Sequence, residues 1–105
     1  MKLVILRSAQ NDLTDGFWFY EKQAAGLGRY FLDSLLTEIE SLLTHAGFHR
    51  KAFAAHRLLS RRFPYAIYYE MTEDTVQIKA VLDCRRNPAV IKKRLRQAHQ
   101  PFDER

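Results

Sequence analysis

Two segments of alternating side chains, separated by a short polar turn, constrain the fold of this chain most strongly. The first is Tyr65 to Met71 and the second is Val76 to Asp83, with Thr72-Glu-Asp-Thr75 between them. In the second segment one side is uniformly apolar and carries Val76, Ile78, Ala80 and Leu82. A period of two is the signature of an extended strand. The pattern therefore predicts a β-hairpin with an apolar face that another part of the chain must cover.

Two amphipathic helices are predicted before this hairpin. The first begins at about Ser8, a good N-cap residue, and its apolar side chains recur at spacings of three and four. The second runs from about Leu27 to Ala46, and Gly47 follows as a helix-ending residue. Its apolar stripe consists of Phe31, Leu35, Ile39, Leu42 and Ala46. Each helix has a single apolar stripe, so we expect a helical hairpin packed on the sheet.

The remaining segments complete an α+β pattern. Lys2 to Arg7 and His56 to Ser60 are predicted strands, and Asn87-Pro88 begins a short helix that ends at about Arg96. The order β-α-α-β-β-β-α predicts a small, mostly antiparallel sheet. Its amino-terminal strand precedes the helical hairpin, and a three-strand meander precedes the carboxy-terminal helix, which shields part of the other face. We expect one domain over residues 1–97 and a tail over residues 98–105.

Charge is distributed unevenly along the 105 residues, which carry a net charge of +5. Residues 1–49 hold four basic and six acidic side chains, a net of 4 − 6 = −2. Residues 50–105 hold thirteen basic and six acidic side chains, a net of 13 − 6 = +7. A positive field at one end of a small protein favours nucleic acid or an acidic protein as a partner. The alternative is that the charge serves solubility alone.

Several classes of protein are disfavoured by the sequence. No apolar run reaches the roughly 18 residues of a membrane span, and the amino end lacks the features of a signal peptide. We therefore expect a cytoplasmic protein with no membrane partner. The single Cys84 cannot form an internal disulfide or anchor a zinc site alone, and the histidines lack metal-ligand spacing. We expect no metal and no cofactor.

Basic side chains gather at the ends of the predicted meander and in the helix after it. We predict a basic contact surface made of Arg57, Arg61, Arg62, Arg85, Arg86, Lys92 and Lys93. Arginines at the rim of a small sheet are suited to holding an anionic group. The alternative for the lysines is a solvated helix face.

Two motifs in this region resemble those of a known family. They are Arg62-Phe-Pro-Tyr-Ala-Ile-Tyr-Tyr69 and Ala80-Val-Leu-Asp-Cys-Arg-Arg-Asn-Pro88. Over about residues 3–95 the chain resembles the RelE/ParE superfamily of type II toxin–antitoxin toxins, and it is closer to the ParE-like, plasmid-stabilisation branch. The resemblance implies the fold predicted above. It also implies a cytoplasmic toxin that is neutralised by a cognate antitoxin in a hetero-oligomer.

The resemblance implies one of two mechanisms. RelE-like members cleave messenger RNA in the ribosomal A site, whereas ParE-like members poison DNA gyrase. RNA cleavage requires a base, cations that hold the phosphate, and an acid. Of the family's nuclease residues, Arg86 matches the arginine after the last strand. His56 stands near a lysine position, Tyr65 at an arginine position, and Lys92 near the terminal acid. Because this set is incomplete, we predict a toxin that binds and inhibits DNA gyrase and is not an enzyme.

Two alternatives stay open at this point. In a variant nuclease acting on the ribosome and mRNA, His56 would be the base, Tyr65 or Tyr68 would position the substrate, and Arg86 would hold the phosphate with Arg57 and Arg85. The tyrosines also have a simpler interpretation, because aromatic residues in strands commonly pack in the core. The second alternative is a non-toxic homologue of the same fold that only binds a partner.

Overall fold

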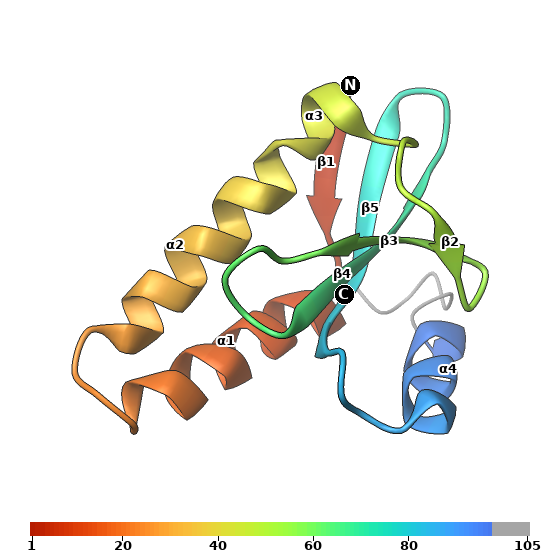
Figure 1. Cartoon of the computed structure of the whole chain (residues 1–105). Helices are drawn as coiled ribbons and strands as arrows, with labels where there is room; N and C mark the ends of the chain where they lie inside the picture. The colour runs from red at the N-terminus through yellow and green to blue at the C-terminus, as the bar shows by residue number, and fades with distance from the viewer. Residues whose placement is uncertain (98–105) are drawn as a thin grey trace.

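The computed structural model describes residues 1–97, and its element order confirms the predicted α+β class (Figure 1). The predicted tail, residues 98–105, lies outside the described residues. In chain order the elements are β1 (Lys2–Ile5), α1 (Arg7–Glu21), α2 (Leu27–Glu40), α3 (Leu42–His45), β2 (Lys51–Ala52), β3 (Ala55–Leu59), β4 (Tyr65–Met71), β5 (Thr75–Asp83) and α4 (Pro88–Gln97). Every described helix is too short or too polar to span a lipid bilayer.

The five strands form one sheet in the order β1-β5-β4-β3-β2. Only β1 and β5 are parallel, so the sheet is mostly antiparallel, as predicted. The hairpin of β4 and β5 pairs Tyr65 with Asp83 at one end and Met71 with Val76 at the other. A register shift between Tyr68 and Tyr69 leaves one extra residue on β5, which is typical of a β-bulge. The single apolar side predicted for this strand is therefore wrong, because Val76 and Ile78 join the core under the helical hairpin whereas Ala80 and Leu82 join the core under α4.

Strand β2 was not predicted. It joins β3 through a two-residue turn at Phe53 and Ala54, whose φ angles are 57° and 66°. Two-residue hairpin turns of this kind need positive φ at both positions, which usually means Asn or Gly. Since neither residue is present here, the turn gives no signal in the sequence. The strain is offset by packing, because the Phe53 ring lies 6.3 Å from that of Tyr68.

The α1–α2 hairpin covers one face of the sheet and encloses the larger core, as predicted (Figure 1). The predicted stripe of α2 is fully buried at Phe31, Leu35 and Ile39, and Leu42 of α3 continues it. Gly16 of α1 has a steric role, since a Cβ atom built there would lie 2.5 Å from the Phe31 ring. The close approach of the two helices therefore depends on this glycine.

Helix α4 covers part of the opposite face and encloses a second, smaller core. Its members include Ala55, Ala66, Tyr68, Ala80, Leu82, Ile91 and Leu95. Because Tyr68 is only 1% exposed, its predicted packing role is confirmed and the alternative role in positioning a substrate is wrong. Asn87 starts the helix as expected, since its Oδ1 accepts the Ala89 N–H at 2.8 Å.

Two helix boundaries differ from the prediction. The N-cap of α1 is Leu6 and not Ser8, because the Leu6 carbonyl already accepts the first helical hydrogen bond and the side chain of Leu6 is buried. The Ser8 hydroxyl instead donates to the carbonyl of Lys79 at 3.1 Å. The single helix expected up to Ala46 is divided at Ser41 into α2 and α3.

Candidate functional site

The seven predicted contact residues are all exposed, but they do not share one face of the sheet. Arg57 is paired across the β3–β4 ladder with Tyr68, which belongs to the core under α4. Burial raises the pKa of Tyr68, and the adjacent Arg57 guanidinium partly offsets this effect. Arg62, by contrast, lies over the ring of Tyr30 on α2. The basic residues are therefore divided between the two sides of the sheet.

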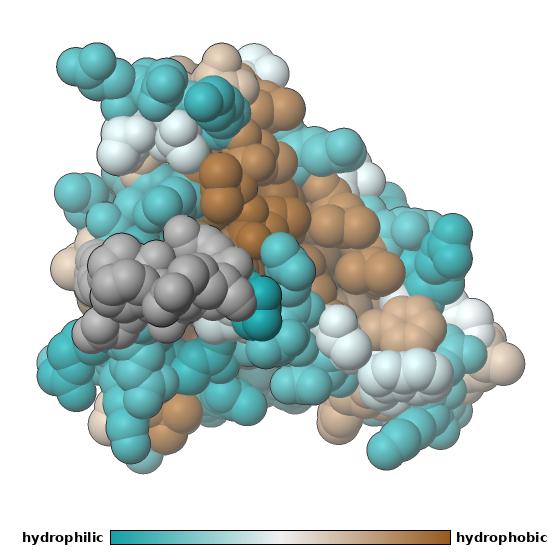
Figure 2. Space-filling model, turned by 180° about the vertical axis from the view of Figure 1, so that it is seen from behind, coloured by the Kyte–Doolittle hydropathy of each residue, from teal (hydrophilic) through white to brown (hydrophobic). Residues whose placement is uncertain are grey.

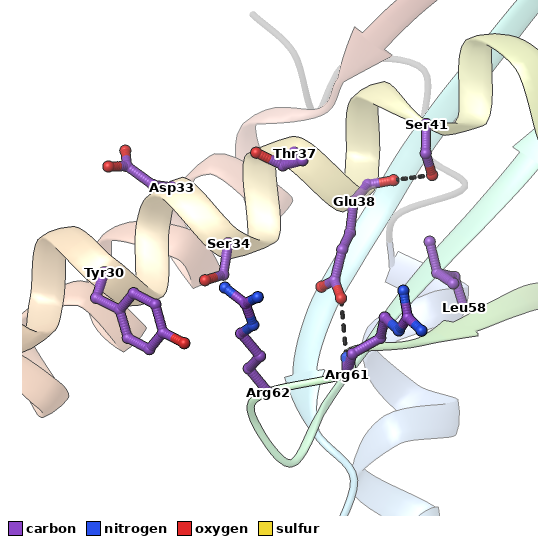
Figure 3. Close-up of a pocket in the computed structure, with 9 residues that line it drawn as sticks. All are labelled: Tyr30, Asp33, Ser34, Thr37, Glu38, Ser41, Leu58, Arg61 and Arg62. Atoms are coloured by element: carbon purple, nitrogen blue, oxygen red, sulfur yellow. Dashed lines mark hydrogen bonds between the residues drawn. The ribbon is translucent and has the colours of Figure 1, made fainter.

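Arg61 and Arg62 border a groove between α2 and the end of β3 (Figure 3). We call it the α2–β3 groove. Its volume is about 480 Å³. The lining residues are Tyr30, Asp33, Ser34, Thr37, Glu38, Ser41, Leu58, Arg61 and Arg62. Short hydroxyl side chains on α2 form one wall, and the segment that follows β3 forms the other. The groove therefore has a polar wall and an arginine-bearing wall.

The carboxylates that line the α2–β3 groove do not form ion pairs with the guanidiniums of Arg61 and Arg62. The backbone N–H of Arg61 donates to Glu38 Oε2 at 2.8 Å, which ties the β3–β4 turn to α2. Asp33 forms an ion pair with Arg29 at 3.4 Å. The Arg62 guanidinium lies 5.7 Å from the centre of the Tyr30 ring. Within residues 1–97, neither the Arg61 nor the Arg62 guanidinium has an ion-pair partner.

A second pocket of about 300 Å³ brings Tyr65 and Arg86 together. We call it the Arg86 pocket, and it is also lined by the carboxylates of Asp12, Asp15 and Asp83. Burial, with smaller contributions from nearby Tyr20 and Asp83, raises the pKa of Tyr65 to about 12. A phenol is neutral when protonated and negative when deprotonated, so Tyr65 cannot replace the expected cation at any pH. Two of these carboxylates, Asp83 and Asp12, are paired with Arg85 and Arg94, so the pocket holds mixed charge and not a cluster of free cations for a phosphate group.

Two ion pairs near the Arg86 pocket engage the guanidiniums of Arg85 and Arg94. Arg85 binds Asp83 through Nη2–H at 2.6 Å and Nε–H at 2.9 Å, and these bonds lower the pKa of the Asp83 carboxyl. Arg94 of α4 donates to both oxygens of Asp12 on α1, at 2.9 Å each. The Asp12 side chain is 8% exposed and also accepts the Val81 N–H at 3.0 Å. Burial raises the pKa of Asp12, and these hydrogen bonds partly counter that effect.

The Asp12–Arg94 pair was not anticipated as part of this region. The two residues are 82 positions apart, and neither lies in a recognisable motif. Their contact joins α4 to α1 directly beside the Arg86 pocket. It gives α4 a polar attachment in addition to its apolar packing.

His56 is engaged in a structural contact away from the Arg86 pocket. Its Nδ1–H donates to the carbonyl of His49 at 2.7 Å, and its ring stacks on Tyr69 at 5.0 Å. It is paired with Tyr69 across the ladder, four positions along β4 from Tyr65. At about 3.3 Å per residue, that separation is about 13 Å. The structure thus brings Tyr65 and Arg86 together but leaves His56 apart from them.

Metal binding gains no support from the described residues. Within residues 1–97, no three His, Cys, Asp or Glu side chains are placed to hold one metal ion.

Several large apolar side chains are exposed at the surface, and Figure 2 shows a band of hydrophobic surface across the face seen from behind. Trp18 and Phe19 on α1 are 55% and 53% exposed, and Phe48 is 81% exposed. Contiguous exposed apolar surface marks sites of protein–protein contact, so the adjacent Trp18 and Phe19 on α1 are candidates for such a site.

Comparison with known proteins identifies a class of fold. The sequence matches no protein-family model, and no curated protein matches it. Among solved structures, a similar fold occurs in a chain of the chromosomal ParDE TA system from P. aeruginosa. The TM-score is 0.67 at 17% identity, and the match covers 77% of this chain and 92% of the other. The fold implied by the two sequence motifs is thereby confirmed, while the branch of the family and the activity stay predictions.

Proposed function

We propose that the protein is a ParE-like toxin of a type II toxin–antitoxin system. The observation that carries this proposal is the likeness of fold to a chain of the ParDE TA system, which extends over 92% of that chain. The motifs at residues 62–69 and 80–88 support the same conclusion independently. The proposal places the protein in the cytoplasm with a cognate antitoxin as its partner.

In this proposal the toxin acts by binding and carries out no covalent chemistry. The arrangement of the nuclease candidates supports this mechanism. His56 lies about 13 Å along β4 from Tyr65, and the phenol of Tyr65 supplies no positive charge. Arg86 shares its pocket with Asp15, a carboxylate in no ion pair within residues 1–97, which would weaken its hold on the phosphate of RNA. By analogy with ParE-like members, we propose DNA gyrase as the protein that is bound and inhibited.

The proposed antitoxin has two properties that complement the surface of this chain. Acidic residues would meet the basic end, since residues 50–105 carry a net charge of 13 − 6 = +7. Apolar residues would cover exposed side chains such as Trp18 and Phe19 on the helical hairpin. Together they would form a toxin–antitoxin hetero-oligomer.

Induced expression of the full chain without an antitoxin tests the function. We expect arrested growth, with induction of a DNA-damage reporter and no early loss of protein synthesis. Normal growth at confirmed expression would overturn the toxin proposal and favour a non-toxic binding homologue. Early arrest of translation would favour the ribosome-dependent nuclease. Toeprinting on programmed ribosomes would then show A-site cuts that Arg86→Ala abolishes.

A further inference from the structure

We propose that the α2–β3 groove is a docking site for an extended acidic peptide segment of a partner protein, whose carboxylates pair with Arg61 and Arg62. This proposal deepens the function proposed above and rests on it only for the identity of the partner, since a toxin requires an antitoxin. The site itself follows from the geometry of the groove.

The guanidiniums of Arg61 and Arg62 are available to bind a ligand in the groove. They have no ion-pair partner within the described residues, although they border a cavity of about 480 Å³. A guanidinium binds a carboxylate through two parallel hydrogen bonds, which are among the stronger contacts of a protein surface. In Figure 3 the Arg62 side chain extends toward the wall formed by α2, close to Ser34. A carboxylate entering the groove would meet a guanidinium and nearby hydroxyl groups.

The edge of β3 that faces away from β4 is exposed beside the groove. Strand β2 pairs only with Ala55 and His56, so within the described residues no strand covers the edge of β3 beyond Arg57. The Ser60 N–H donates to the Tyr65 carbonyl, so the alternation of the ladder directs the Leu59 N–H away from β4, to this edge. The Leu58 side chain lines the groove itself. An extended peptide beside β3 would therefore gain backbone hydrogen bonds as well as side-chain contacts.

The dimensions of the groove set the length of the segment. Tyr30 on α2 and Ser41 at its C-cap are the first and last residues of the α2 wall, and they are eleven positions apart, or about 16 Å at 1.5 Å per residue. An extended chain rises about 3.3 Å per residue, so about five residues fit. The short side chains of Ser34, Thr37 and Ser41 leave room for it along the helix. We therefore expect a segment of about five residues with two carboxylates.

The mixed charge of the groove favours a peptide over a nucleic acid. Glu38 and Asp33 line it together with the two arginines. A nucleic acid carries a phosphate at every nucleotide, and its continuous negative charge would meet both carboxylates. A peptide can place its carboxylates at the arginines alone and neutral groups elsewhere.

The test uses the full chain and a displayed library of random short peptides. We expect enrichment of peptides with two Asp or Glu residues close together. Synthetic copies should bind the Arg61→Ala/Arg62→Ala variant at least about tenfold more weakly, as expected for the loss of charge-assisted hydrogen bonds. This variant should fold, because the bond to Glu38 comes from the backbone N–H of Arg61. The Lys2→Ala/Arg7→Ala variant is the matched control, because it also removes two exposed cations, lies outside the predicted basic contact surface and should bind normally.

Two further measurements locate the peptide. Thr37→Trp should fill the groove and weaken binding about as much as the double arginine variant, and amide NMR signals of Ser34, Glu38 and Leu59 should shift on titration. The proposal is overturned if no acidic peptides are enriched or if binding to the double variant is unchanged. It is also overturned if the shifts map to α4, or if a single-stranded RNA oligonucleotide binds the groove and the peptides do not. None of these measurements depends on toxicity, so failure of the docking proposal can be distinguished from failure of the toxin proposal.

Discussion

The buried pair of Asp12 and Arg94 makes a strong prediction about stability. Its two hydrogen bonds join α1 to α4, and the side chains are 8% and 24% exposed. Asp12 accepts three N–H groups in all, because Val81 donates to it as well. Only an ionised carboxylate can accept on both oxygens without turning its own O–H toward a donor. Removing its charge therefore leaves the mostly buried guanidinium of Arg94 without an ionic partner, and its other bond is a long one of 3.5 Å to the Ser8 carbonyl.

The size of the effect follows from these contacts. Breaking a buried ion pair by removing one partner costs about 3–5 kcal/mol, and the partial exposure of Arg94 places Asp12→Asn near the lower end, about 3 kcal/mol. Asp12→Ala also leaves the buried Val81 N–H unpaired, which adds about 1–2 kcal/mol. Arg94→Leu in the Asp12→Asn background should recover about 1–2 kcal/mol, because no unpaired charge is then left.

Urea denaturation followed by far-UV circular dichroism measures these differences. The matched control is Asp15→Asn, an exposed carboxylate on the same helix, which should change the free energy of unfolding by less than about 0.5 kcal/mol. If Asp12→Asn were as stable as the Asp15→Asn control, the pair would not hold α4 in place, and the reasoning would be wrong.

Three further predictions concern the core and the loop before β2. Gly16→Ala should destabilise the protein by about 1–3 kcal/mol, more than the gain in helix propensity of about 1 kcal/mol, because its Cβ would collide with Phe31. Tyr69→Phe should cost about 1–3 kcal/mol, since its buried hydroxyl accepts the Gly47 N–H at 2.9 Å and contacts His49 Nδ1 at 2.7 Å. Burial lowers the pKa of His49 below 6.5, so its contribution to stability is present above pH 6.5 and is lost as the pH falls through the lowered value.

Thermal unfolding monitored by circular dichroism measures all three effects. Asn11→Ala, an exposed change on α1, is the control and should raise the melting temperature slightly through helix propensity alone. A Gly16→Ala variant whose melting temperature rises as well would contradict the packing argument. An unchanged melting temperature in Tyr69→Phe would show that the hydroxyl contacts contribute nothing. For His49 the comparison is between pH 7 and about pH 5. His49→Gln should lose less stability over this range than the natural chain, and equal losses would contradict the assignment.

The elements with a clear period were predictable from the sequence. The apolar stripe at Phe31, Leu35 and Ile39 requires a helix with one buried face, and the alternation from Val76 to Leu82 requires a strand. The turn at Phe53 and Ala54 was not predictable, because its positive φ angles depend on packing beneath α4 and not on the usual turn residues. Ser8 was misplaced for a similar reason, since its hydroxyl has a tertiary partner in Lys79.

The candidate site was predictable only in its residue types. The sequence contains the arginines, but it does not show that strand alternation places Arg57 on one side of the sheet and that the turn places Arg62 on the other. The same limit applies to Asp12 and Arg94, whose contact depends on how α4 returns to α1. The α2–β3 groove likewise depends on the separation of α2 from β3, which no local pattern encodes.

Inhibition of purified DNA gyrase tests the central claim most directly. The claim is that this fold acts as a toxin by binding and without covalent chemistry. We predict that the purified full chain inhibits supercoiling in a dose-dependent way, that Arg86→Ala retains much of this inhibition, and that programmed ribosomes incubated with the chain show no A-site cleavage. Undiminished supercoiling at micromolar excess of the folded protein, together with A-site cuts that depend on Arg86, would contradict the claim.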